Sequence, residues 1–247
     1  MKITIAQLDI ADHRYEENAA KVVRIIAEHA HSDIILFPEL ALTGFPKVNE
    51  VQNAFEHSQA ALAQIDKASK AVSANVILGH IEQYEGKFYN SAYLFSNGDT
   101  FILHRKAHLW LDDVGVFQKG HQCPLVNLQG AMCGAQICFD LEFPEGSRAL
   151  ALAGADLILM PNGNMHPYAN THFVLTQARA IENQLFVATC NRVGTGHGGR
   201  FVGESLVVSP FGEVLMQLGA EEVIQTVEID LKQVQKSRSE YRYIQNV

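Results

Sequence analysis

The sequence predicts an α/β fold in which two β-sheets pack face to face and helices cover their outer sides. Strand-like and helix-like segments alternate near both ends of the chain, and a strand-rich stretch with a hairpin signal lies between them. The 247 residues are 47% hydrophobic, which is enough to bury a sizeable core. No Pro/Ser-rich linker interrupts the chain, so we expect one domain over residues 1–247.

The N-terminal third has the pattern β-α-β-α-β. Residues 2–8 alternate apolar and polar side chains, as a strand does, and residues 16–30 place their apolar side chains on one helical face. Residues 33–37 form a short apolar run that ends at a proline, which predicts a buried strand. A helix near 52–73 and a strand near 75–79 repeat the cycle.

The rest of the chain is richer in strands. Residues 88–95 and 100–104 flank Asn97 and Gly98, and Asn-Gly between two strand-like runs predicts a hairpin. Further strands are expected at 131–137, 156–160, 185–190, 201–208, 213–217 and 223–229. Helices are expected at 144–153 and 168–183, and the first of them has a proline near its first turn.

Composition excludes several classes of protein. The net charge is −8 and no run of Lys and Arg occurs, which argues against a nucleic-acid binder. No apolar stretch reaches the roughly 18 residues of a membrane helix, and the N-terminus lacks a secretory signal, so we expect a cytoplasmic protein. The eleven histidines do not group with cysteines or carboxylates at ligand spacing, so we expect no metal and no other cofactor. The four cysteines, at 123, 133, 138 and 190, follow no disulfide or zinc spacing.

Three reactive side chains each follow an apolar strand, where active-site residues of layered α/β proteins tend to lie. Glu39 stands among apolar residues that would raise its pKa and let it shuttle protons. Lys106 ends a hairpin strand and, if buried, could stabilise an oxyanion. Taken singly, Glu39 is better explained as a glutamate that faces solvent at a helix start, and Lys106 as a basic strand end in water.

Cys138 lies between a predicted strand and the helix expected from Pro144. A sharp strand-to-helix turn exposes a nucleophile and places it beside free backbone N–H groups, here that of Phe139. The alternative is that Cys138 is a small buried apolar residue.

These segments, in this order, resemble those of the nitrilase superfamily of carbon–nitrogen hydrolases. The matching motifs are Phe37-Pro38-Glu39-Leu40, His104-Arg105-Lys106-Ala107-His108-Leu109 and Ile137-Cys138-Phe139-Asp140-Leu141-Glu142-Phe143-Pro144-Glu145, and the resemblance covers nearly the whole chain. It implies an α-β-β-α sandwich and a Glu39, Lys106, Cys138 triad that hydrolyses a small amide through a thioester. It also implies pairing of two subunits, with the tail at about 237–247 crossing to the partner, in a homodimer or a higher oligomer.

One departure from the family's pattern concerns the loop after the lysine motif. Many members carry a second glutamate there, whereas Asp113 is the best match in this chain and is one methylene shorter. The resemblance implies that Asp113 assists catalysis by orienting substrate or Lys106. Its alternative role is to cap a short helix in the loop.

The residues around Cys138 give expectations about the substrate. Phe139-Asp140 resembles the amidase and carbamoylase branches more than the Trp-Glu of nitrilases, so amides come first, N-carbamoyl compounds second and nitriles third. Glu142 would repel a substrate carboxylate and tolerate a neutral or cationic amide, unless it pairs with a surface base such as Arg148. Asn164 and His166 are candidate substrate contacts. The alternative is that their segment, which is rich in Pro, Asn and Gly, forms a turn without touching substrate.

Two other functions compete with hydrolysis by this triad. An inactive relative that binds a small ligand is supported only by the departure at Asp113. A cysteine protease would need a histidine base near the thiol, for which His166 is the best candidate.

Overall fold

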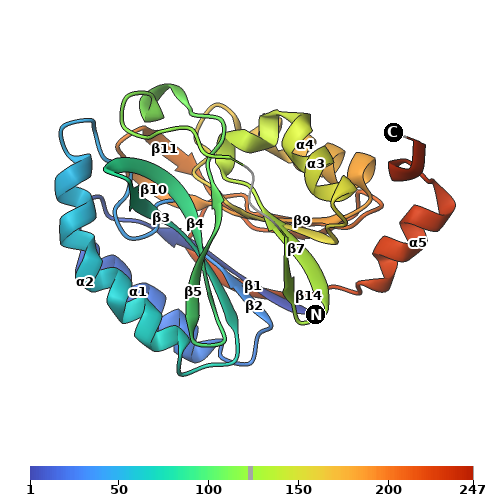
Figure 1. Cartoon of the computed structure of the whole chain (residues 1–247), viewed down its shortest axis with the longest axis horizontal. Coiled ribbons are helices and arrows are strands. Elements are labelled where there is room, and N and C mark those ends of the chain that lie inside the picture. The colour runs from blue at the N-terminus through green and yellow to red at the C-terminus, as the bar shows by residue number, and fades with distance from the viewer. Residues whose placement is uncertain (122–124, 247) are drawn as a thin grey trace.

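The computed structural model of the protein describes residues 1–121 and 125–246. These residues form two β-sheets that face each other, with helices on both outer sides (Figure 1). The predicted fold class is therefore confirmed.

The first sheet has the strand order β11-β10-β1-β2-β3-β4-β5, and β14 also pairs with β1. Strands β1, β2 and β3 run parallel, whereas β4 and β5 extend the sheet as antiparallel hairpins. One edge of β1 pairs with β2, and its other edge is shared by antiparallel β14 and parallel β10. The strands span Lys2–Asp9 (β1), Ile34–Leu36 (β2), Asn75–Tyr84 (β3), Lys87–Ser96 (β4), Asp99–Arg105 (β5), Arg192–Gly196 (β10), Gly199–Val202 (β11) and Val223–Glu228 (β14).

The second sheet has the order β13-β12-β9-β8-β7-β6. Its centre, β7-β8-β9, is parallel, and antiparallel strands close both ends. The strands span Val126–Leu128 (β6), Ala131–Ala135 (β7), Leu157–Pro161 (β8), Phe186–Cys190 (β9), Leu206–Val208 (β12) and Val214–Gln217 (β13).

Helices cover the two outer faces (Figure 1). The first sheet is covered by α1 (Tyr15–Glu28) and α2 (Val51–Ser69), and the second by α3 (Pro144–Leu152) and α4 (Ala169–Asn183). The buried face of α1 is an apolar stripe that includes Val22, Ile25 and Ile26, as the helical period requires, whereas the buried face of α4 is mostly polar. Helix α5 (Lys232–Glu240) lies at the C-terminal end of the molecule, apart from these layers.

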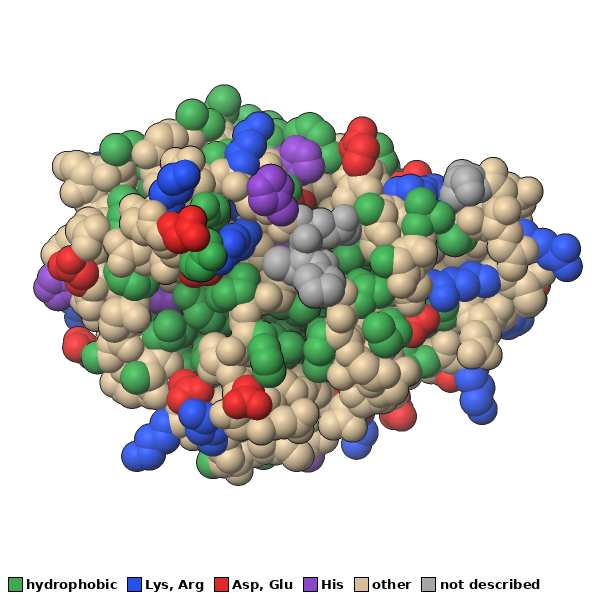
Figure 2. Space-filling view, viewed as in Figure 1, with side chains coloured by type: hydrophobic (Ala, Val, Ile, Leu, Met, Phe, Trp, Pro, Cys, Tyr) green, Lys and Arg blue, Asp and Glu red, His purple; other side chains and the backbone are tan. Residues whose placement is uncertain are grey.

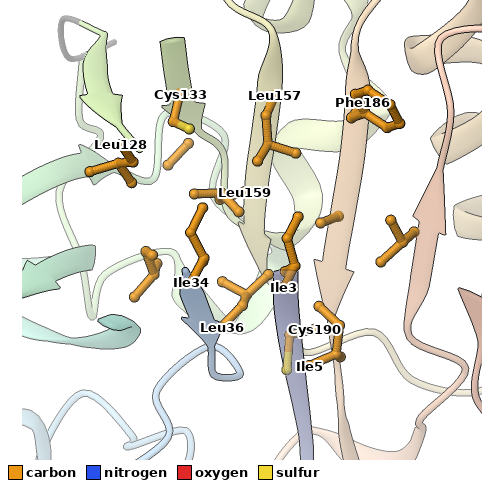
Figure 3. Packing of buried hydrophobic residues seen from close by; sticks show 14 of the residues in the cluster. Ile3, Ile5, Ile34, Leu36, Leu128, Cys133, Leu157, Leu159, Phe186 and Cys190 are labelled. Atoms are coloured by element: carbon orange, nitrogen blue, oxygen red, sulfur yellow. The ribbon is translucent and has the colours of Figure 1, made fainter. Parts of the chain in front are cut away.

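The main core lies between the two sheets. Figure 3 shows Ile3, Ile5, Ile34 and Leu36 of the first sheet packed against side chains of the second, among them Leu159. These side chains are fully buried. Because each sheet also packs against helices, its strands are apolar on both faces, which explains the continuous apolar runs in the sequence.

The hairpin expected at Asn97 and Gly98 is present. Both residues have positive φ, 53° and 88°, and they connect Ser96 of β4 directly to Asp99 of β5. This is the geometry that Asn-Gly favours in a two-residue hairpin.

Residues 201–208 do not form the single strand that the sequence predicted. Gly203 and Glu204 have φ of 67° and 53°, which ends β11 and sends the chain into the other sheet as β12. The short strands β6 and β10 and the polar helix α5 were also not predicted, because none has a long apolar pattern. Part of the predicted tail, 237–240, is thus helical.

The surface agrees with the composition. On the face in Figure 2, basic and acidic side chains are interspersed, and hydrophobic side chains gather over β4 and β5. Among the helices of the two described ranges, none combines the length and the apolar character needed to cross a bilayer.

Candidate active site

A pocket opens where the loops after β5, β7 and β8 meet, and its empty space, together with the solvent at its mouth, amounts to about 340 Å³. Lys106 and Cys138 lie in its wall, which is otherwise largely aromatic. The lining residues are Phe45, Lys106, Trp110, Cys138, Phe139, Glu142, Gly163, Asn164, Met165, Tyr168 and His172.

Glu39 is fully buried beside this pocket, in the turn that follows β2. Its Oε1 accepts hydrogen bonds from Lys106 Nζ and Asn90 Nδ2, both at 2.7 Å. Its Oε2 has no hydrogen-bond partner among the described residues. Burial raises the pKa of the Glu39 carboxyl above its ordinary value, against the lowering effect of Lys106.

Lys106 connects two carboxylates. Its Nζ lies 2.7 Å from Glu39 Oε1 and 2.6 Å from Asp113 Oδ2, and its side chain is 1% exposed. Burial opposes the charge, but Asp113 and Glu39 together raise the pKa of Lys106 well above its ordinary value. Asp113 is placed by the 3-10 helix η1 (Leu111–Asp113), where its Oδ2 also accepts the Trp110 N–H. The shorter side chain therefore reaches Lys106, and it also caps the short helix.

Cys138 begins a second 3-10 helix, η2 (Cys138–Glu142), three residues after β7 ends at Ala135. Its φ of 45° is unfavourable for a non-glycine residue and marks the sharp turn expected of an exposed nucleophile. The first N–H groups of such a turn, including that of Phe139, have no acceptor within the helix and face outward. The start of η2 is therefore suited to bind a negative oxygen.

The Cys138 thiol is kept protonated by its surroundings. Burial and the nearby charge of Glu39 raise its pKa well above the ordinary value, although Lys106 and a hydrogen bond from the Gly163 backbone act in the opposite direction. Gly163 also borders Glu39, because a Cβ at Gly163 would lie 2.7 Å from Glu39 Oε2. The partnerless carboxylate oxygen and the thiol thus lie against the same residue.

Cys138 is more exposed to solvent than the other described cysteines. Cys133 and Cys190 are fully buried in the core between the sheets, whereas Cys138 is partly exposed and lines the pocket. Cys123 lies outside the described residues.

Asp140 ties the cysteine turn to the lysine segment. Its Oδ2 accepts hydrogen bonds from Ile137 N–H at 3.0 Å and His104 Nε2 at 2.9 Å. Its Oδ1 accepts from Ala107 N–H, His108 N–H and His108 Nδ1 at 2.9–3.1 Å. Burial alone would raise the pKa of Asp140, but the hydrogen bonds from His104 and His108 hold it well below its ordinary value.

The structure brings most of the predicted substrate contacts to the pocket. Phe139, Glu142 and Asn164 line it, but the side chain of His166 is exposed and does not. His166 follows the pocket-lining segment, and its backbone N–H is held by Arg200 O, so its side chain lies outside the wall. Glu142 lies 3.6 Å from His172 Nε2, and the structure records no pairing with Arg148.

The comparisons with known proteins agree with this geometry. The carbon–nitrogen hydrolase family model matches residues 2–239. The chain belongs to the carbon–nitrogen hydrolase family. It is 38% identical to an (R)-stereoselective amidase of a Pseudomonas species, over all of this chain and 91% of that protein. It is 33% identical to a 2-oxoglutaramate amidase of Bacillus subtilis, over 94% of this chain and 93% of that one.

Solved structures show the same fold. A CN-hydrolase superfamily protein of Xanthomonas campestris matches with a TM-score of 0.91 and 22% identity, covering all of this chain and 97% of that one. The family match and these relatives support a hydrolase that acts on carbon–nitrogen bonds.

Several residues of this carbon–nitrogen hydrolase site were not predicted from the sequence. Asn90 orients Glu39 through a hydrogen bond. His172, Trp110 and Tyr168 line the pocket. Arg179 donates a hydrogen bond from Nε to Leu141 O at 3.0 Å and so anchors the end of η2. No local signal marks the rings, since an aromatic residue in a loop or helix is more often part of a core.

No metal site is found in the ranges that the structure describes: no group of three or more His, Cys, Asp or Glu side chains there could hold an ion.

Proposed function

We propose that this hydrolase cleaves small amides through a thioester on Cys138, with Glu39 as the proton carrier. Support comes from the three side chains around one pocket and from the amidases among its relatives. Residues 1–247 would then form one catalytic domain.

In the first half-reaction, Glu39 accepts the Cys138 proton and the thiolate attacks the amide carbonyl. The raised pKa of the thiol makes a base necessary, and the raised pKa of Glu39 suits a group that takes up a proton and gives it back. The negative oxygen that develops is stabilised by Lys106 and the Phe139 N–H. Losing one such donor typically costs about 3–4 kcal/mol of transition-state stabilisation.

In the second half-reaction, Glu39 protonates the departing ammonia or amine, and the acyl group stays on sulfur. Glu39 then takes a proton from water, which attacks the thioester. The acid is released as the carbon–sulfur bond breaks, and Glu39 returns the proton to the departing Cys138 thiolate. Asp113 keeps the Lys106 ammonium in place throughout, because Lys106 Nζ lies between the two carboxylates.

One observation carries the assignment of Glu39 as base. Its Oε1 is occupied by Lys106 and Asn90, whereas its Oε2 is buried without a hydrogen-bond partner among the described residues and borders Gly163, which lines the pocket together with Cys138. A buried carboxylate oxygen without a hydrogen bond is costly, and a thiol proton would satisfy it.

The test is ammonia release from a panel of small amides, N-carbamoyl compounds and nitriles. Wild type should release ammonia from amides, and Cys138→Ala should release none while keeping the wild-type unfolding midpoint. Cys133→Ala, which removes a buried thiol away from the pocket, should retain activity. Activity in Cys138→Ala would refute the proposal. If wild type releases ammonia from no compound of the panel, and iodoacetamide alkylates Cys138 no faster than Cys133, the protein is better explained as an inactive relative that binds a small ligand.

We also propose that two subunits pair through the outer faces of α3 and α4. Leu152, Val174 and Ile181 are 55%, 51% and 40% exposed there, and a partner subunit on this side would remove their apolar surface from water. The tail at 237–247 would cross to the partner subunit. Light scattering should give the mass of a dimer, or a multiple of it, for wild type. Val174→Asp should give a lower mass. A monomeric wild type would refute the pairing.

A further inference from the structure

Glu142 brings an unpaired carboxylate to the pocket. Its side chain is 27% exposed and lines the cavity. No residue that the structure describes donates a hydrogen bond to it, and the nearest side chain that could carry a positive charge is His172, whose Nε2 lies 3.6 Å from Glu142 Oε1. That distance is too long for a hydrogen bond.

The His172 ring is held from the side of its Nδ1, away from Glu142. Asn162 Oδ1 accepts the Gly163 N–H at 3.0 Å, which fixes the orientation of the Asn162 amide. The amide nitrogen therefore faces His172 Nδ1, at 3.2 Å, and donates to it. His172 therefore makes a side-chain hydrogen bond to Asn162 and none to Glu142.

No permanent cation of the wall pairs with Glu142. Among the described residues that line the pocket, Lys106 carries the single permanent positive charge, and its ammonium is already held by Glu39 and Asp113. Glu142 therefore adds a third carboxylate to a site with one permanent cation. The rest of the wall is rich in aromatic rings, with Trp110 in edge contact with both Phe139 and Tyr168 at centroid distances of 5.1 and 5.2 Å. Aromatic faces and an unpaired carboxylate both attract organic cations.

We propose that the pocket selects amides whose acyl chain carries an ammonium group, which pairs with Glu142 while the amide carbonyl reaches Cys138. This substrate class rests on the proposed amide hydrolysis. Glu142 stands at the end of η2, four residues after Cys138. At about 2 Å of rise per residue, a 3-10 helix separates the two backbone positions by about 8 Å, so a spacer of a few methylenes suits the site.

The experiment compares kcat/KM for three amides of matched length: γ-aminobutyramide (ammonium), valeramide (neutral) and succinamate (carboxylate). Wild type should prefer them in that order. Glu142→Gln should lower the ammonium-to-neutral ratio about tenfold, as expected for loss of one partly buried charge pair. The control is Glu145→Gln, which removes an equal charge from an exposed residue that does not line the pocket, and it should leave the ratio unchanged.

Each outcome decides between the proposals. Hydrolysis of valeramide as fast as or faster than γ-aminobutyramide would overturn the charge selection and leave amide hydrolysis standing. An equal fall of the ratio in Glu145→Gln would also overturn it, because the effect would then come from overall charge. If wild type hydrolyses no amide, the proposed function fails, and calorimetry on Cys138→Ala decides the selectivity: tighter binding of γ-aminobutyramide than of valeramide supports it, and equal binding refutes it.

Discussion

Replacing Asp140 by asparagine tests whether one buried carboxylate holds the site together. The aspartate accepts five hydrogen bonds, two of them from His104 and His108 side chains and three from backbone N–H groups. Asparagine has nearly the same shape but turns one accepting oxygen into a donor. At least two of the five hydrogen bonds are then lost, which at about 1.5–3 kcal/mol for each hydrogen bond to a charged group predicts a loss of about 3–6 kcal/mol in the free energy of unfolding.

The assay is urea unfolding of wild type and Asp140→Asn at neutral pH, with Asp112→Asn as control. Asp112 is exposed and should change the free energy of unfolding by less than about 0.5 kcal/mol. The folded pKa of Asp140 is lowered, so its contribution to stability is fully present above the unfolded value of about 3.9. That contribution is lost as pH falls through the folded pKa. The difference between wild type and Asp140→Asn should therefore shrink only in strong acid. A loss below about 1 kcal/mol at neutral pH would refute the reasoning.

Two further predictions concern the charges around Cys138. Asp113→Asn should lower kcat at least about tenfold, because Lys106 loses the carboxylate 2.6 Å from its Nζ. The control Asp112→Asn should leave kcat and KM unchanged. Equal kcat in both variants would contradict the role of Asp113. The acid limb of kcat/KM should have its midpoint above the ordinary glutamate value of about 4.3, because Glu39 acts as a base only when ionised and burial raises its pKa. A pH titration of kcat/KM with its midpoint at or below that value would count against Glu39 as the base.

The sequence predicted elements well wherever a single local pattern decides them. The strand at residues 2–8, the helix at 144–153 and the Asn97-Gly98 hairpin are all present, because alternation, helical period and turn residues each act within a few positions. Residues 201–208 show the limit. Their apolar character predicts a strand, but two positive-φ residues divide it between two sheets, and this depends on packing that no local pattern records.

The site shows the same division. Glu39, Lys106 and Cys138 could be proposed because each follows a strand within a recognisable motif. Asn90 could not be placed, because it approaches Glu39 across 51 positions of sequence. The neighbourhood of Glu142 was equally hidden: the sequence offered Arg148 as its alternative partner, whereas the fold brings His172 of α4 to within 3.6 Å of it.

The pairing of β1 has a consequence for synthesis of the protein. The edge of β1 away from β2 is completed by β10 and β14, whose residues begin at 192 and 223, so β1 is synthesised long before the strands that complete this edge. At roughly 5–20 residues per second, this edge stays unpaired for on the order of ten seconds or more. Its exposed N–H and C=O groups could pair with another nascent chain during that interval. A truncation before residue 223 would make this exposure permanent, so such fragments should aggregate even though they contain Glu39, Lys106 and Cys138.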